Sequence, residues 1–280
     1  MLQPYATPLE KLWFYAFRLF CIGVLVFLIL PLLVIVPLSF SADSFLMYPI
    51  HSFSLRWYEA FFTNSEWMDS LKNSMIVAPA ATLLATVLAT VLGTVAAVGL
   101  TSADFPGKSF MMTVLISPMV VPVVIVGVGA YLFFAPLGLA NSYLGLVMVH
   151  AALGVPFVVI TVSATLRGFN PNLVRASASL GGNPVYTFFR VTLPLIAPGV
   201  ISGGLFAFAA SFDEVVVTLF LAGPEQTTLP RQMFAGIKEN ISPTIAAAAT
   251  VLILFSIVLL LTLEWLRGRS EKMRTAASAA

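Results

Sequence analysis

The chain has 280 residues, of which 59% are hydrophobic and 9% are charged, and its formal net charge is +2. Soluble domains carry about a quarter charged residues, so this composition excludes a chain that exposes its whole surface to water. The apolar runs are continuous, which predicts an all-α polytopic integral membrane protein. The one cysteine, Cys21, excludes an internal disulfide and a cysteine metal cluster.

Six apolar segments are long enough to cross about 30 Å of hydrocarbon, which takes about 20 helical residues. The first segment is longer than the apolar core of a signal peptide, so we predict an uncleaved anchor. The six predicted transmembrane helices lie near Phe17–Phe40, Asn73–Leu100, Phe110–Phe134, Ser142–Leu166, Leu195–Ala222 and Pro243–Leu266.

The Lys and Arg residues of the connections predict the orientation. If the N-terminus is cytoplasmic, ten of these residues lie in inner segments, whereas Arg56, Arg231 and Lys238 lie in outer ones. Because cytoplasmic connections carry an excess of Lys and Arg, we predict that both termini are cytoplasmic. The chain then divides into an N-terminal segment with the first helix (1–41), an outer connection (42–72), a core of five transmembrane helices (73–266) and a cytoplasmic tail (267–280).

The second predicted helix carries a stripe of small residues. They recur at every fourth position, which favours the close approach of another helix. The outer connection is instead rich in aromatic residues, as expected of amphipathic segments at the membrane interface. The stripe consists of Ala81, Ala85, Ala89, Gly93 and Ala97.

The connection between the fourth and fifth helices, about residues 167–194, contains signals for two short helices. Asn170-Pro171 and Asn183-Pro184 are typical helix starts. Gly181-Gly182 supplies a left-handed stop between them, and Pro194 is predicted to end the second helix. The segment contains three Arg and no acidic residue. From these residues alone, a loop held on the membrane surface and a docking element for another protein both stay open.

This segment resembles the EAA loop of permease subunits of binding-protein-dependent (type I) ABC importers. The family pattern is E-A-A, three residues, G, nine residues, then I-x-L-P, and the spacing here is the same. Arg replaces the family's Glu, and Ser replaces its second Ala. The resemblance implies that the loop inserts into a cleft of an ATP-binding subunit. The coupling residues that it implies are Arg175, Ala176, Ser177, Gly181, Val191, Leu193 and Pro194.

Three more segments resemble permeases of the spermidine/putrescine type: NSEWMDSLKNS, PLGLANSYLGLVMVHAALGVPFVV and SFDEVVVTLFLAGPEQTTLP. The resemblance implies a type I importer core in a bacterial inner membrane. Its implied partners are the lipid bilayer, a second and similar permease, two ATP-binding subunits and a periplasmic solute-binding protein, with no nucleic acid. It implies ATP and Mg on the ATPase, no cofactor on this chain, and alternating access. The implied solute is putrescine or spermidine, or else another amine or an amino-acid derivative.

Asp213 and Glu214 are adjacent within the apolar run AASFDEVVVTLFLAG. A charged acid in the bilayer costs about 2.5–3.5 kcal/mol on insertion scales, so it faces a partner, the bundle interior or a water-filled path. On a continuous helix the two acids would point about 100° apart and lie about 27 Å from Leu195, toward the outer side. Either at least one carboxylate binds a cationic solute, with Ser211 as a further candidate, or the pair makes structural hydrogen bonds.

His150 is a second polar side chain within the predicted membrane segments, and no other potential ligand accompanies it at metal-binding spacing. A hydrogen bond between helices is therefore favoured over a role in the pathway. Prolines and glycines of the third and fourth predicted helices are interpreted as kinks or close-packing points, or else as gate hinges, and the kink is favoured. These residues are Pro118, Pro122, Gly127, Gly129 and Pro156.

The sequence contains no G-x-x-x-x-G-K-[ST] phosphate loop, so ATP hydrolysis is expected in a separate subunit. It also lacks serine–histidine, zinc and paired-acid patterns at recognised spacing, and we therefore predict that the chain is not an enzyme. Two alternatives from other classes are an intramembrane hydrolase that uses His150 and a passive channel. The predicted cytoplasmic hairpin argues against the channel, because a passive channel needs no docking element.

Overall fold

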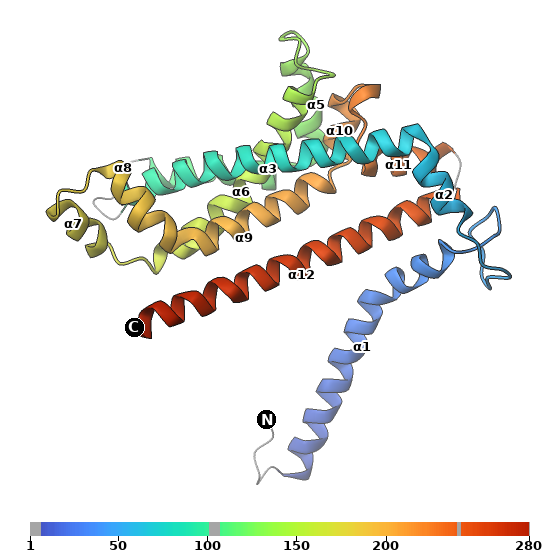
Figure 1. The fold of residues 1–280 in the computed structure, drawn as a ribbon, viewed down its shortest axis with the longest axis horizontal. Helices are drawn as coiled ribbons and strands as arrows, with labels where there is room; N and C mark the ends of the chain where they lie inside the picture. The colour runs from blue at the N-terminus through green and yellow to red at the C-terminus, as the bar shows by residue number, and fades with distance from the viewer. Residues whose placement is uncertain (1–6, 101–106, 240–241, 280) are drawn as a thin grey trace. The chain divides into compact units, whose positions relative to one another are not determined.

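The computed structural model describes residues 7–100, 107–239 and 242–279, and the ordered elements are helical (Figure 1). The chain forms two compact units, one of Met1–Asn64 with Gly236–Ala280 and one of Ser65–Ala235. The predicted all-α architecture is confirmed. The two units are described in turn.

The first unit contains α1 (Pro8–Leu38), α2 (Arg56–Thr63) and α12 (Pro243–Ala279). A capping box begins α1, because the Thr7 hydroxyl accepts from Glu10 N–H while the Glu10 carboxylate accepts from Thr7 N–H. After α1, the hydroxyls of Ser39 and Tyr58 share a hydrogen bond of 2.6 Å, which ties α2 to the end of α1. The first helix and the connection that follows it are therefore held together.

The second unit holds the other elements, apart from the last residues of α11. Its long helices α3, α6 and α9 lie alongside one another, and α7 and α8 lie at the opposite end of this bundle from α10 (Figure 1). The elements are α3 (Ser65–Leu100), α4 (Lys108–Val120), α5 (Val123–Phe134), α6 (Tyr143–Arg167), α7 (Asn172–Ser179), α8 (Pro184–Thr187), the π-helical turn η1 (Phe188–Thr192), α9 (Leu193–Phe212), α10 (Val216–Leu221), the 3-10 turn η2 (Pro224–Gln226) and α11 (Leu229–Glu239).

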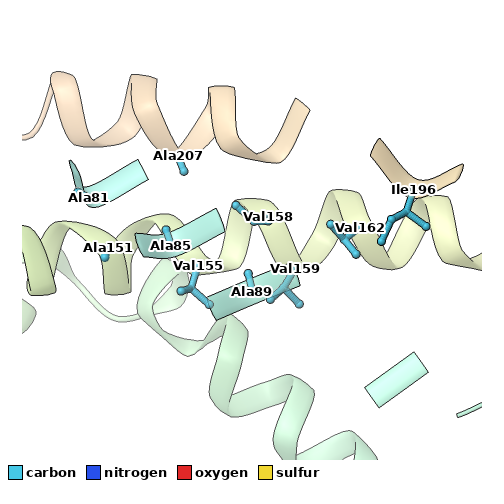
Figure 2. Packing of buried hydrophobic residues seen from close by; sticks show 10 residues of the cluster. All are labelled: Ala81, Ala85, Ala89, Ala151, Val155, Val158, Val159, Val162, Ile196 and Ala207. Carbon is cyan, nitrogen blue, oxygen red and sulfur yellow. The ribbon is translucent and has the colours of Figure 1, made fainter. Parts of the chain in front are cut away.

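The main core of this unit consists of small and β-branched residues from α3, α6 and α9. In Figure 2, Ala207 of α9 points toward the α3 alanines, and the α6 valines lie beside them. Ala81, Ala85 and Ala89 are buried here, which confirms the first three positions of the predicted stripe. The burial of the last two positions, Gly93 and Ala97, lies outside what the structure describes. Small residues let the three helices approach closely.

Glycines make the closest approaches in this core. A Cβ placed on Gly154 of α6 would lie 3.0 Å from the Cβ of Ala207 and 3.1 Å from the Cβ of Ala85. A Cβ on Gly203 of α9 would lie 2.6 Å from the Cα of Val158 and would also meet the Thr161 hydroxyl. No side chain fits at Gly203, so α6 and α9 are in backbone contact there.

A second core forms where α5 and α10 pack against α3 and α6. A Cβ on Gly127 of α5 would lie 2.8 Å from Cδ2 of Phe220 in α10, so this glycine is a close-packing point, as predicted. α10 is thus held within the protein although it has six residues. The buried members of this cluster are Val77, Phe134, Leu146, Val149, Val217, Leu221 and Ala222.

Among the described residues, four helices are long and apolar enough to cross a membrane, or five if one bent pair is a single span. The bent pair is Ser109–Val120 with Val123–Phe134, which turn by 103° at the break. One continuous helix over Phe110–Phe134 is therefore wrong, but the break lies at Pro122, one of the residues predicted to interrupt this segment. Pro122 is the physical reason, because it has no N–H and drives Val121 into an extended conformation, with ψ 133°. The predicted count of six spans stays a prediction.

The predicted boundaries of the fifth span are also wrong. An apolar helical run extends without interruption over Pro184–Phe212, through Pro194 and Pro198. The π-helical turn explains why Pro194 does not end the helix. The N–H of Leu193 donates to the carbonyl of Phe188, five residues back, so the hydrogen-bond register has already shifted before the proline. The second helix predicted for the 167–194 connection and the predicted fifth span are thus one element.

α12 begins at Pro243 as predicted, and its described apolar part is Pro243–Leu259. The helix then continues to Ala279, through the residues of the predicted cytoplasmic tail 267–280. The polar tail sequence therefore prolongs the last helix.

Candidate functional site

The two acids lie in a short non-helical turn between two helices and not on a continuous helix. α9 ends at Phe212, Asp213 occupies the C-cap position, and α10 begins at Val216. Oε1 of Glu214 accepts from the N–H of Val217 at 2.9 Å, so Glu214 caps the first turn of α10. The assumption that both acids lie 100° apart on one helix is wrong, because this unwound turn, Asp213–Val215, separates two helices.

The two carboxylates have different surroundings. Asp213 is exposed, and its carboxylate has no hydrogen-bond or ion-pair partner in the part of the chain that the structure describes. Glu214 is half-buried, and its carboxylate accepts a hydrogen bond from a backbone N–H of α10. Asp213 is therefore the acid that is free to bind a cation, and Glu214 is the acid that maintains the break.

His150 lies in a buried polar cluster beside this turn. Its side chain is 1% exposed. Nδ1 is 2.9 Å from the Ser211 hydroxyl in α9, and Nε2 is 3.2 Å from the Thr218 hydroxyl in α10. The predicted hydrogen bond between helices is present. Ser211 is buried in this cluster and is not at an exposed surface. In the described ranges, no group of three or more His, Cys, Asp and Glu side chains could hold a metal ion.

A latch of hydrogen bonds fixes the segment after α10. Nδ2 of Asn73 donates to the carbonyls of Glu225 and Thr227 at 2.8 and 2.9 Å, and Oδ1 of Asn73 accepts from the Tyr143 hydroxyl at 2.6 Å. The guanidinium of Arg231 donates to the carbonyl of Ala222 at 2.8 Å, at the end of α10. Partial burial lowers the pKa of Arg231 through loss of hydration. Sequence reasoning missed this latch, although Asn73 lies in a segment that carried the family resemblance.

The two short helices predicted between residues 170 and 194 begin, and the first of them ends, at the predicted residues. Oδ1 of Asn170 accepts from Asn172 N–H at 3.0 Å, and Oδ1 of Asn183 accepts from Tyr186 N–H at 2.8 Å. Gly181 has φ +84°, the left-handed conformation that stops α7. We call this helix–turn–helix of α7 and α8 the coupling hairpin.

Two buried hydroxyls hold the coupling hairpin closed. Ser177 of α7 and Thr187 of α8 share a hydrogen bond of 2.8 Å. A Cβ on Gly182 would lie 2.5 Å from the Ser177 hydroxyl and 2.9 Å from the Ser177 carbonyl, so this turn position admits only glycine. The Ser that replaces the second Ala of the family pattern therefore has a structural role.

The predicted coupling residues are only partly gathered in one place. Ala176, Ser177, Gly181 and Val191 line a hollow of about 550 Å³. Arg175 is exposed outside this hollow, where its guanidinium lies 3.4 Å from Oδ1 of Asn172, and Leu193 and Pro194 belong to α9.

The outer surface of the coupling hairpin is apolar. Leu180 and Val185 are 89% and 66% exposed, and Phe189, in the adjoining η1, is 59% exposed. Large exposed apolar side chains close together are typical of an interaction surface. The segment 167–194 also has three Arg and no acid, so it is basic.

Comparisons with known proteins identify the family of this chain. Residues 89–273 match the family described as "Binding-protein-dependent transport system inner membrane component". The chain is 29% identical to the spermidine/putrescine transport system permease protein PotC of Haemophilus influenzae, over 88% of this chain and 94% of that protein. It is 33% identical to the putrescine transport system permease protein PotI of Escherichia coli K12, over 89% of each.

The fold has a solved counterpart. A bacterial ABC transporter involved in the import of the acidic polysaccharide alginate contains a chain with a TM-score of 0.70 and 14% identity, covering 95% of this chain and 99% of that one. At this identity the likeness shows the fold. The family match extends over more than half of the chain, from the core of α3 into α12. The chain therefore belongs to the family of binding-protein-dependent transport system inner membrane components.

Proposed function

We propose that this permease subunit of an ABC importer carries a polyamine, and that Asp213 is a carboxylate that binds the solute on its way through the membrane. The observation that carries the proposal is the exposed carboxylate of Asp213, which has no partner among the described residues and lies at a break in an apolar run. The similarity of the chain to permeases named for putrescine and spermidine supports the solute class.

A polyamine suits this site because its ammonium groups donate charge-assisted hydrogen bonds to a carboxylate. An ion on an apolar path is stabilised by an opposite charge that is not already neutralised. Asp213 meets this requirement, since it has neither a cation nor a donor beside it in the described part of the chain. Glu214 acts indirectly, by capping α10 and keeping the turn open.

The expected assembly contains two ATP-binding subunits, a second permease that is similar or identical to this one, and a periplasmic solute-binding protein. The exposed apolar side chains of the coupling hairpin, in a segment with three Arg and no acid, support its docking to an ATP-binding subunit, which would bind the ATP and Mg. The surplus of Lys and Arg in the inner segments supports an inner-membrane orientation with both termini in the cytoplasm.

The mechanism that we propose is alternating access, in which the ATPase pair moves the coupling hairpin. The helical run Pro184–Phe212 has 29 residues, or roughly 44 Å at 1.5 Å per residue. It begins in the coupling hairpin and ends next to Asp213. A displacement of the hairpin therefore reaches the solute-binding carboxylate through one continuous helical run.

Replacing Asp213 with Asn tests this function. A hydrogen bond to a charged group contributes about 1.5–3 kcal/mol, so Asp213→Asn is expected to raise the KM for putrescine and spermidine uptake about 10-fold to 100-fold. Glu214→Gln keeps an oxygen for the Val217 N–H and should have a smaller effect. Uptake of the labelled amines is measured in proteoliposomes that contain the complete complex and its binding protein.

The control is Asp43→Asn, which removes the same charge from the outer connection and should leave the KM within about 2-fold. An unchanged KM in Asp213→Asn would contradict the role of this carboxylate. Failure of the wild-type complex to import either amine, while its ATPase responds to another loaded binding protein, would contradict the solute class.

A further inference from the structure

We propose that His150 is a positioning residue for transport: its imidazole joins the end of α9 to the start of α10 and holds the turn that carries Asp213 and Glu214. This inference goes beyond the proposed function, because it concerns how the break is maintained. It rests on the proposed function in one respect, namely that Asp213 contacts the solute.

The position of His150 carries the first step. Its ring projects from the N-terminal third of α6, and its two nitrogens reach hydroxyls on either side of the turn, that of Ser211 at 2.9 Å and that of Thr218 at 3.2 Å. Ser211 lies two residues before Asp213, and Thr218 lies four residues after Glu214. One side chain thus links both helices that meet at the unwound turn to a third helix.

Both ring nitrogens of His150 have partners. Nδ1 is bonded to the Ser211 hydroxyl and Nε2 to the Thr218 hydroxyl, and the Thr218 hydroxyl also lies 3.2 Å from the carbonyl of Glu214. His150 is therefore not placed to bind a solute itself.

The same cluster reaches the backbone of the turn. Thr218 connects His150 to the carbonyl of Glu214, and the Glu214 side chain in turn caps Val217. Buried hydrogen bonds of this kind favour one arrangement of the groups that they join. Farther along α6, threonines that face α9 donate instead to carbonyls of their own helix, as Thr161 does to Phe157. The imidazole therefore anchors α9 to α6 next to the proposed solute-binding turn.

Three substitutions of His150 separate its hydrogen bonds from its volume. His150→Phe keeps a ring but removes both bonds, His150→Gln keeps a donor that reaches the position of Nε2, and His150→Asn keeps an acceptor near that of Nδ1. In the complete complex, His150→Phe is expected to raise the KM for putrescine uptake about 10-fold with the maximal rate within about 2-fold. Gln and Asn should each recover part of the loss.

A matched control is Thr113→Val, which removes a hydroxyl that bonds to Ser109 within α4. It should leave both kinetic parameters unchanged. Combining His150→Phe with Ser211→Ala should raise the KM no further than His150→Phe alone, because the two residues share one interaction. If His150→Phe does not accumulate in the membrane, Ser211→Ala with Thr218→Val removes both bonds and carries the same expectation.

A second measurement needs no transported solute. In a Cys21→Ser background, Asp213→Cys introduces a thiol at the turn, and its rate of reaction with a membrane-impermeant maleimide reports the exposure of that position. Adding His150→Phe is expected to change this rate at least about 5-fold, because the turn loses its anchor. Adding Thr113→Val should not change it.

The outcomes decide the inference separately from the proposed function. An unchanged labelling rate overturns it, as does additive behaviour of His150 and Ser211 or a failure of both Gln and Asn to recover the KM. If the wild-type complex imports no amine but His150→Phe changes the labelling rate, the proposed solute is wrong and the positioning role stands.

Discussion

Gly203→Ala is expected to prevent stable packing of α9 against α6, although it adds a single methyl group. The added Cβ would lie 2.6 Å from the Cα of Val158 and would also meet the Thr161 hydroxyl. A backbone atom cannot rotate away as a side chain can, so the two helices must separate along their contact. Overpacking costs typically 1–3 kcal/mol, and we expect at least about 3 kcal/mol here because backbone is involved.

The experiment compares the thermal unfolding of purified wild-type and variant protein in detergent, together with the amount inserted in the membrane. Gly129→Ala, in α5, is the control, because a Cβ at this position meets nothing within 4 Å. That variant should match or slightly exceed the wild type, since Ala has the higher helix propensity. A Gly203→Ala variant as stable as Gly129→Ala would show that the observed α6–α9 contact is not the native one.

The second large effect is expected in the coupling hairpin. Gly182→Ala would place a Cβ 2.5 Å from the Ser177 hydroxyl and 2.9 Å from the Ser177 carbonyl, which breaks the bond between Ser177 and Thr187 or opens the turn. Because α8 continues into α9, a displaced hairpin no longer transmits its motion along the same axis. We expect solute uptake to fall at least about 10-fold while ATP hydrolysis persists.

Gly181→Val tests the same turn in another way. Its Cβ has open space, but φ +84° is strained for a β-branched residue, so a partial loss of coupling is expected. The ratio of solute molecules imported to ATP hydrolysed, measured in proteoliposomes, separates uncoupling from loss of protein. Gly129→Ala is again the control. A normal ratio in Gly182→Ala would contradict the assignment of this hairpin to coupling.

Composition and the residues that start and stop helices predicted much of the architecture. Continuous apolar runs predicted the long helices, and the bounds of α6, Tyr143–Arg167, differ from the prediction by one residue at each end. The turn of the coupling hairpin was predictable because glycine and asparagine have strong local preferences, which Gly181, Asn170 and Asn183 follow.

The breaks were not predictable from hydrophobicity. Pro122 and the pair Asp213-Glu214 mark the two breaks in the sequence, but an apolar run has nearly the same composition whether the chain continues or turns. The 103° bend before α5 and the unwound turn at Asp213 therefore did not follow from the hydropathy. The opposite error occurred at Pro194, where a local rule predicted an end but a π-helical turn kept the helix continuous.

The contacts of the candidate site were beyond the reach of local patterns. Ser211 is 61 residues from His150, and the Asn73 amide reaches carbonyls more than 150 residues away. Such pairs depend on how α3, α6 and α9 pack together, and no spacing rule in one sequence connects them. The residues could be selected as polar side chains in apolar surroundings, but their partners could not.

The helical run from Pro184 to Phe212 also constrains changes in chain length. One added residue rotates everything beyond it by about 100°, whereas seven residues, about two full turns, restore the orientation to within about 20° and lengthen the run by about 10.5 Å. Insertions and deletions between these two ends therefore alter either the azimuth of Asp213 or its depth in the bilayer. Either change would alter the position of the carboxylate relative to the coupling hairpin. Apart from close-packed positions such as Gly203, this stretch should therefore tolerate substitution better than a change in its number of residues.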